Sequence, residues 1–143
     1  MKRAMEASGS FPAKISEIEK IYGMISLALS GSGIDASVET LFKMAADEIF
    51  SNIVNHGFGG LQDGDVTVSI QAGDGEASMT FRDGGRPFDP MSIPAPDVSL
   101  GLEERQAGGL GIYIVLGSFD EVRYAFENGF NVFTVKKRLH GTA

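Results

Sequence analysis

Two dipeptides, Asp74-Gly75 and Asn128-Gly129, most constrain what this chain can fold into, because both favour tight two-residue hairpin turns. Before and after the first turn, apolar residues alternate with polar ones, as they do in a strand with one buried face. The four strands predicted around the two turns cover residues 66–71, 77–82, 119–126 and 130–139. The sequence therefore predicts two hairpins whose apolar face needs a cover.

Two helices are predicted upstream of these hairpins, where apolar residues recur every three to four positions. The first begins with a capping box at Ser16, and the second begins near Asp35 or Ser37 and ends at Gly57 or Gly59. The apolar positions of the first helix are Ile18, Ile21, Ile25 and Leu29. Those of the second are Val38, Leu41, Phe42, Ala45, Ile49 and Ile53.

A short strand over residues 4–11 is predicted to precede the helices, and Pro12 ends it. These elements predict an α+β fold: a two-layer α/β sandwich with helices on one face of a mixed, mostly antiparallel sheet. A chain of 143 residues suits a single domain over residues 1–143.

Composition excludes several classes of function. The chain has no Cys, which rules out disulfides, thiolate metal sites and thiol nucleophiles, and two histidines leave little for a zinc site. A net charge of −7 disfavours a nucleic-acid or anionic-membrane surface. The basic run Lys136-Lys137-Arg138 is expected to keep an edge strand soluble. No apolar run suits a signal peptide or the ~20 residues of a membrane span, so we expect a cytoplasmic protein.

A polar stripe on the second helix is the first candidate site. Glu48, Asn52 and His56 lie four residues apart, which places them on one helical face. A solvent-exposed face would also explain this spacing, but Asn is a poor helix former and so calls for some compensation in mid-helix. If the stripe lines a cleft, the Asn52 side-chain oxygen suits Mg²⁺ and Glu48 suits proton abstraction.

The end of the first hairpin is the second candidate. Asp83 follows the last strand residue, and its carboxylate suits the exocyclic amine of adenine, which is a hydrogen-bond donor. Gly84-Gly85 follows, where the lack of a Cβ would let a base approach the backbone, although Asp-Gly-Gly is also a common turn. Phe88, between two prolines, is a stiff apolar anchor that suits the floor of a base pocket.

A glycine run is the third candidate. Gly108, Gly109, Leu110 and Gly111 precede an apolar segment that reads as the start of a buried helix. The free N–H groups and the dipole of a helix N-terminus favour an anion such as phosphate. The run is not a Walker A loop, because no Lys-Ser/Thr pair follows it. The long segment before it suits an active-site lid, and Arg105 in that segment either reaches phosphate or is a surface charge.

Three motifs follow one another along the chain: Glu-x-x-x-Asn-x-x-x-His, Asp-x-Gly with Phe-Asp-Pro nearby, and Gly-Gly-Leu-Gly. In this order they resemble the N, G1 and G2 boxes of GHKL ATPases. The chain is most similar to the stand-alone anti-sigma-factor serine/threonine kinases of the RsbW type, over nearly its whole length. The closing run Asn128-Gly129-Phe130-Asn131-Val132-Phe133-Thr134-Val135 is also similar to the last hairpin of that branch.

The resemblance implies a histidine-kinase-like ATPase fold, with ATP and Mg²⁺ as cofactors. It implies that Glu48 is the catalytic base, that Asn52 coordinates Mg²⁺, and that Asp83 contacts adenine with Gly85 shaping its pocket. The implied phosphate-binding residues are Gly109 and Gly111, with Gly108, Leu110, His56, Phe88 and Arg105 as further nucleotide contacts.

The resemblance also implies a function. Such a kinase phosphorylates a Ser or Thr of a STAS-domain anti-anti-sigma protein and so switches between that partner and a sigma factor, and a homodimer is compatible with the branch. One alternative is a non-catalytic nucleotide-binding module that sequesters a partner, which the retained Glu48 disfavours. Another is the ATP domain of a histidine kinase, which no phosphoacceptor helix pair precedes here.

Overall fold

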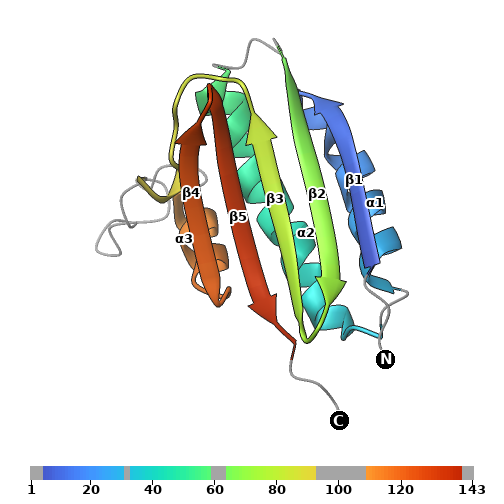
Figure 1. Ribbon diagram of the computed structural model, residues 1–143. Coiled ribbons are helices and arrows are strands. Elements are labelled where there is room, and N and C mark those ends of the chain that lie inside the picture. The colour runs from blue at the N-terminus through green and yellow to red at the C-terminus, as the bar shows by residue number, and fades with distance from the viewer. Residues whose placement is uncertain (1–4, 31–32, 59–63, 93–108, 140–143) are drawn as a thin grey trace.

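One antiparallel sheet with helices on a single face makes up the computed structural model, which describes residues 5–30, 33–58, 64–92 and 109–139. The sheet order is β1-β2-β3-β5-β4 (Figure 1). The strands are β1 (Met5–Pro12), β2 (Asp65–Gly73), β3 (Glu76–Asp83), β4 (Glu121–Glu127) and β5 (Phe130–Arg138). The helices are α1 (Ile18–Ser30), α2 (Ala36–Asn52) and α3 (Gly109–Leu116). Three short turns complete the described elements: η1 (Ile15–Glu17), η2 (Ile53–Gly57) and η3 (Pro90–Ser92).

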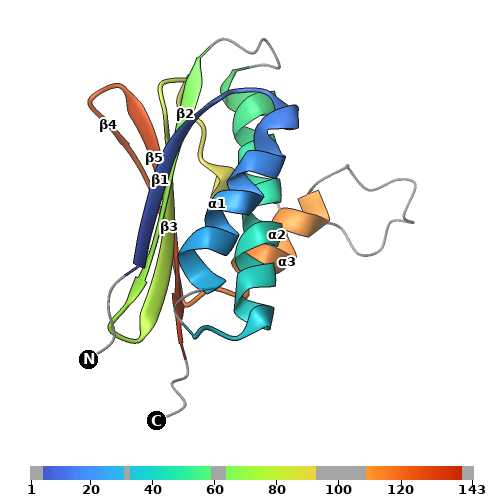
Figure 2. The ribbon, with the colours of Figure 1, turned by 90° about the vertical axis from the view of Figure 1, so that its right-hand side faces the viewer.

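The two-layer arrangement confirms the predicted fold class. Figure 2 shows α1, α2 and α3 together on one side of the sheet, with the other side left uncovered. Every strand pairing among the described residues is antiparallel, whereas the sequence predicted a mixed, mostly antiparallel sheet. The first strand covers Met5–Pro12, so it extends one residue beyond the predicted end at Phe11, and Ala4 lies outside the described residues.

Both predicted hairpin turns are confirmed. Asp74 and Asn128 have φ of 52° and 54°, and the glycines that follow them, Gly75 and Gly129, have φ of 80° and 85°. Positive φ at both central residues is the signature of a type I′ turn, whose twist matches that of the flanking strands. The local sequence therefore sets the register of β2 with β3 and of β4 with β5.

The core lies between the sheet and the helices, where every second strand residue meets the apolar stripes of α1 and α2. The largest fully buried side chains are Phe42, Phe50, Phe81, Phe133, Ile21, Ile25, Leu29, Ile49, Ile70, Met79, Val66 and Val68. On α2, Val38 is half-buried but packs against the core as predicted, whereas Leu41 is half-buried and does not belong to the core cluster. Ala46 and Phe50, which were not predicted, are buried. Because α2 packs on the sheet, on α1 and on α3, it buries a wider face than one stripe.

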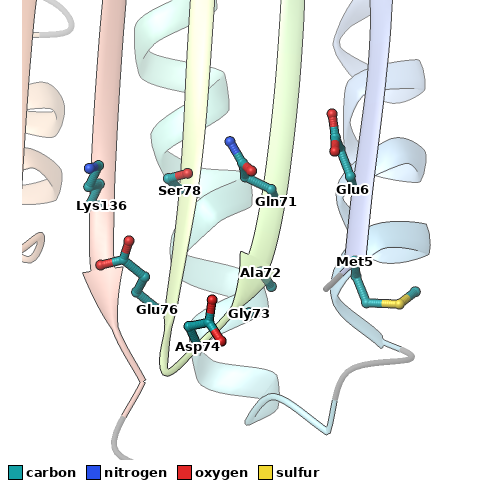
Figure 3. A pocket seen from close by; sticks show the side chains of 9 residues that line it. All are labelled: Met5, Glu6, Gln71, Ala72, Gly73, Asp74, Glu76, Ser78 and Lys136. Atoms are coloured by element: carbon teal, nitrogen blue, oxygen red, sulfur yellow. The ribbon is translucent and has the colours of Figure 1, made fainter. Parts of the chain in front are cut away.

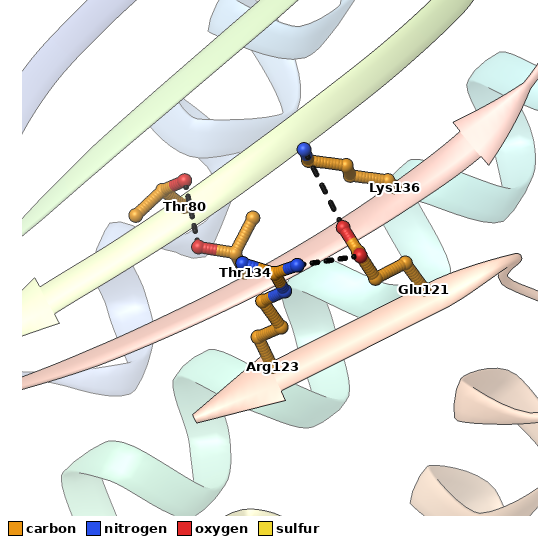
Figure 4. A network of polar contacts seen from close by, with 5 residues as sticks. All are labelled: Thr80, Glu121, Arg123, Thr134 and Lys136. Carbon is orange, nitrogen blue, oxygen red and sulfur yellow. Dashed lines mark hydrogen bonds and ion pairs between the residues drawn. The ribbon is translucent and has the colours of Figure 1, made fainter. Parts of the chain in front are cut away.

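The uncovered face of the sheet is polar. Thr80 and Thr134 are joined by a hydrogen bond of 3.1 Å between their hydroxyl oxygens, and Glu121 forms ion pairs with Arg123 and Lys136 at 3.1 and 3.4 Å (Figure 4). The expectation that Lys136 belongs to an edge strand is wrong, because β5 lies between β3 and β4. Lys136 instead contacts the edge strand β4 through Glu121, across the sheet.

Candidate functional site

Asp83, the last residue of β3, points into the helix side of the sheet and is only 3% exposed. Its Oδ1 accepts hydrogen bonds from the backbone N–H of Gly85 at 2.9 Å and from Asn131 Nδ2 at 3.1 Å. No hydrogen bond from the described residues reaches Oδ2. The carboxylate therefore has one oxygen fixed by the protein and one with its acceptor capacity unused by the described residues.

Burial raises the pKa of Asp83 above its ordinary value, because an ionised carboxylate loses hydration inside the protein. The hydrogen bonds from Gly85 and Asn131 act in the opposite direction, since they stabilise the charged form, but they offset only part of the effect. A buried carboxylate with a raised pKa, one of whose oxygens accepts no hydrogen bond from the described residues, is a typical feature of a ligand site.

Asn131 on β5 connects the strand end to the turn after it. This side chain is 4% exposed, and its Nδ2 also lies 3.3 Å from the carbonyl oxygen of Gly85 and 3.0 Å from that of Arg86. Its Oδ1 accepts a hydrogen bond of 3.0 Å from the backbone N–H of Phe88 and another from the hydroxyl of Tyr124. This role of Asn131 was not predicted from the sequence, although Asn131 is a polar residue in phase with the buried Phe133 and Val135 of the same strand.

The turn after β3 packs directly on η2. The backbone N–H of Arg86 donates to the carbonyl oxygen of Gly57 at 3.2 Å, and Arg86 Nε donates to that of His56 at 2.9 Å. A Cβ added to Gly85 would lie 2.7 Å from the Gly57 oxygen and 3.0 Å from Asp83 Oδ1. Gly85 is thus needed for close contact between two backbone segments, a reason that the sequence did not indicate.

Replacing Gly85 by Ala is therefore expected to lower the unfolding free energy by about 1–3 kcal/mol, because the backbone of η2 cannot move aside freely. The control is Gly84→Ala, since a Cβ there would lie 3.5 Å from the Phe130 ring, which is ordinary contact. Urea unfolding of both variants gives the comparison, and equal stability of the two would contradict this packing.

Glu48 and Asn52 lie one turn apart near the end of α2, and both are half-buried. Asn52 Nδ2 donates to the backbone oxygen of Glu48 at 2.7 Å, which leaves Asn52 Oδ1 as its remaining polar atom. Burial, and then the negative charge of Asp47, raise the pKa of Glu48 above its ordinary value. The pair thus combines a neutral oxygen ligand with a carboxyl group whose proton affinity is increased.

The oxygen atoms at the end of α2 can be compared with the ligands that Mg²⁺ prefers. The described residues contain no group of three or more His, Asp or Glu side chains that could enclose a metal by themselves. Mg²⁺ is usually held by one or two protein oxygens together with substrate phosphates and waters, so a single Asn52 oxygen fits this ion.

His56 departs from the predicted stripe. The backbone N–H of Phe58 donates to the carbonyl oxygen of Ile53 at 3.2 Å, so η2 is a π-helical turn that shifts the residues after Asn52 away from α-helical positions. The His56 ring stacks on Phe88 instead, with ring centroids 4.9 Å apart and planes at 21°. The structure therefore brings His56 to the turn after β3 and next to the predicted floor of the base pocket.

The glycine run is described only in part. Gly109, Leu110 and Gly111 form the first turn of α3, whereas the sequence predicted that they precede the helix, and α3 packs beside α2 (Figure 2). Arg105 and Gly108 lie outside the described residues. The first N–H groups of an α-helix have no partner within it, so this helix start is suited to an anion.

A hollow of about 280 Å³ lies elsewhere, over β1, β2, β3 and β5 near the β2–β3 turn (Figure 3). Its lining residues are Met5, Glu6, Gln71, Ala72, Gly73, Asp74, Glu76, Ser78 and Lys136. None of the candidate site residues lines it, so it does not belong to the site around Asp83. Among the described residues no helix is both long and apolar enough to cross a membrane.

Comparison with known families matches residues 11–137 to the histidine kinase-like ATPase domain. The serine-protein kinase RsbW of Listeria monocytogenes serovar 1/2a is 29% identical over 120 residues, covering 80% of this chain and 76% of that protein. The serine/threonine-protein kinase BtrW of Bordetella bronchiseptica is 26% identical over 100 residues, covering 70% of each chain.

Two solved structures share the fold. One holds the RsbU and RsbW domains of a Mycobacterium tuberculosis protein, with a TM-score of 0.64 at 20% identity. It matches 94% of this chain, which spans only 32% of that longer one. The other is the Acinetobacter baumannii histidine kinase AdeS, with a TM-score of 0.53 at 10% identity over 94% of this chain and 68% of AdeS.

Proposed function

Because the chain belongs to the histidine kinase-like ATPase domain family and to its RsbW-like kinase branch, we propose that it transfers the γ-phosphoryl group of ATP to a Ser or Thr of a STAS-domain anti-anti-sigma protein. The match to this domain family and the protein kinases among the relatives confirm the resemblance predicted from the sequence. The main support for the nucleotide site is the Asp83 carboxylate. Its Oδ1 is fixed by two hydrogen bonds, and its Oδ2 accepts no hydrogen bond from the described residues.

In this proposal Asp83 reads the adenine base. Its Oδ2 accepts a hydrogen bond from the exocyclic amine, which a carboxylate can do and a donor cannot. Phe88, stacked on His56, supplies an apolar surface beside the same turn. Buried charged acceptors make strong hydrogen bonds, so this contact orients the nucleotide as well as holding it.

We assign the phosphates to the region between the end of α2 and the start of α3. Asn52 Oδ1 would hold Mg²⁺, which would neutralise negative charge on the phosphates. The N–H groups at the start of α3, from Gly109 to Gly111, face the phosphate oxygens. Binding at several points along the triphosphate positions its γ-phosphorus for in-line attack, which is the main contribution a protein makes to phosphoryl transfer.

Glu48 is the proposed base. As the incoming Ser or Thr hydroxyl attacks phosphorus, the hydroxyl proton passes to the Glu48 carboxylate and the bond from phosphorus to the ADP oxygen breaks. A raised pKa makes this carboxylate a better proton acceptor, at the cost of a lower ionised fraction in acid.

A transfer assay tests the function. The chain is incubated with radiolabelled ATP, Mg²⁺ and a STAS-domain protein from the same genome, and the expected product is an acid-stable phosphoserine or phosphothreonine on that protein. Binding of the partner without transfer at saturating ATP would favour the nucleotide-binding module instead. An acid-labile phosphohistidine would favour the histidine-kinase alternative.

Other features of this proposal follow the family resemblance and stay predictions. They are a sigma factor as second partner, a homodimer, a cytoplasmic location and a single domain over residues 1–143. A pull-down with and without ATP measures the partner exchange directly, because phosphorylation of the anti-anti-sigma partner decides which of the two partners the kinase holds.

A further inference from the structure

We propose that Asn131 is the positioning residue that aims the Asp83 carboxylate, so that the site selects a base carrying an exocyclic amine. The inference rests on the proposed function, in which Asp83 contacts adenine. It concerns a different element, since Asn131 belongs to β5 and lies 48 positions along the chain from Asp83.

The contacts of Asn131 allow one orientation of its amide. Its Nδ2 lies 3.0 to 3.3 Å from three atoms that only accept: Asp83 Oδ1 and the carbonyl oxygens of Gly85 and Arg86. Its Oδ1 lies 3.0 Å from the backbone N–H of Phe88, which only donates. Turning the amide by 180° would oppose donor to donor and acceptor to acceptor, so the side chain is fixed in rotation.

A fixed Asn131 in turn fixes Asp83. Two donors hold Asp83 Oδ1 from different directions, Gly85 N–H at 2.9 Å and Asn131 Nδ2 at 3.1 Å. Among the described residues, the Gly85 N–H, two residues away in the same turn, is the donor that would remain without Asn131. A carboxylate held by one local donor can rotate about its Cβ–Cγ bond, and Oδ2 then loses its defined direction.

Tyr124 extends this arrangement to the edge strand β4. Its hydroxyl donates to Asn131 Oδ1, the atom that also accepts from Phe88 N–H. A tyrosine hydroxyl is protonated at neutral pH and can donate, and burial raises the pKa of Tyr124 further above its ordinary value. Tyr124 therefore supports Asn131 without contacting Asp83 itself.

Orientation matters because a carboxylate oxygen distinguishes donors from acceptors. Adenine presents an amine at the position where hypoxanthine presents a carbonyl oxygen. A well-aimed Oδ2 binds the first and repels the second, and sites built around such a hydrogen bond discriminate strongly. A freely rotating carboxylate would retain charge but lose much of this discrimination. Asn131 thus affects the selectivity for the base through Asp83, and its replacement should hardly change the rate of transfer of the γ-phosphoryl group.

The test is the ratio of dissociation constants for ITP and ATP, measured with Mg²⁺ by calorimetry, together with KM and kcat for ATP. Wild type is expected to prefer ATP, and Asn131→Leu is expected to lower the ratio at least tenfold. For this variant KM rises while kcat at saturating ATP stays within about threefold of wild type. A structural role alone would weaken both nucleotides equally.

Two further variants keep the test decisive. Tyr124→Phe retains the packing but removes one donor to Asn131, and is expected to lower the ratio by two- to fivefold. If Asn131→Leu fails to fold, the ratio measured for Tyr124→Phe tests the role of Asn131. Thr134→Val is the matched control on β5, because it breaks only the hydrogen bond with Thr80 on the uncovered face and should leave the ratio unchanged.

The outcomes separate the two levels of the argument. A wild-type protein that prefers ATP, with the same preference in Asn131→Leu and Tyr124→Phe, would overturn the role of Asn131 alone. A wild-type protein that binds neither nucleotide, or both equally, would overturn the adenine contact of Asp83 and the inference with it.

Discussion

Replacing Glu48 by Gln is expected to slow phosphate transfer by about 10²- to 10⁴-fold, because Gln has nearly the same shape but cannot take up the hydroxyl proton. ATP affinity should change by less than about threefold, since the proposed base contacts the attacking hydroxyl and not the nucleotide. Single-turnover transfer to the protein substrate gives the rate, and calorimetry gives the affinity. Unchanged transfer would show that Glu48 is not the base.

The pH profile adds a second signature for Glu48. A base must be ionised to accept a proton, so activity should rise with pH through the raised pKa of this carboxyl. Asp47 is the matched control on the same helix, because its charge contributes to that raised pKa. Asp47→Asn should keep activity at neutral pH and shift the rising limb of the profile to lower pH.

Replacing Asp83 by Asn is expected to weaken ATP binding by about 10- to 100-fold, as losing a hydrogen bond to a charged group costs about 1.5–3 kcal/mol. The amide oxygen of Asn can still accept from Gly85 N–H and Asn131, and its NH₂ group then occupies the place of Oδ2. That NH₂ group opposes the adenine amine, donor against donor. Calorimetry with ATP gives the affinity, and wild-type binding by this variant would contradict the adenine contact.

The same variant should not be destabilised. Because the folded pKa of Asp83 is raised, the folded protein binds this proton more tightly than the unfolded chain does. Its contribution to stability is therefore largest in acid and falls as the pH rises from the ordinary pKa of Asp through the raised value. Asp83→Asn has no carboxyl group to titrate, so its stability does not fall with pH for this reason. Urea unfolding across that pH range should show that the variant is at least as stable as wild type at neutral pH.

Local chemistry explains what the sequence could predict. Asp74-Gly75 and Asn128-Gly129 each set a turn within two residues, and the alternation beside them sets which strand face is buried. Asp83 could be singled out because it directly follows a strand and precedes paired glycines. The GHKL resemblance then gave the fold, the family and the kinase class, all of which are confirmed, while the roles of individual site residues stay predictions.

Contacts between distant segments explain what the sequence could not predict. Asn131 meets Asp83 only because β5 pairs with β3 in one particular register, which no turn between them sets. The contact of Gly85 with Gly57 likewise depends on how η2 ends against the sheet. The π-helical form of η2 moved His56 off the predicted stripe and onto Phe88, since an i, i+4 pattern assumes an unbroken α-helix.

The central claim is that one Mg–ATP lies between the end of α2, the end of β3 and the start of α3. A crystal structure with Mg²⁺ and a non-hydrolysable ATP analogue tests it most directly. The expected result is the adenine amine within hydrogen-bond distance of Asp83 Oδ2 and Mg²⁺ on Asn52 Oδ1. A nucleotide bound elsewhere, such as in the hollow beside Lys136, or with its amine turned away from Asp83, would contradict the account.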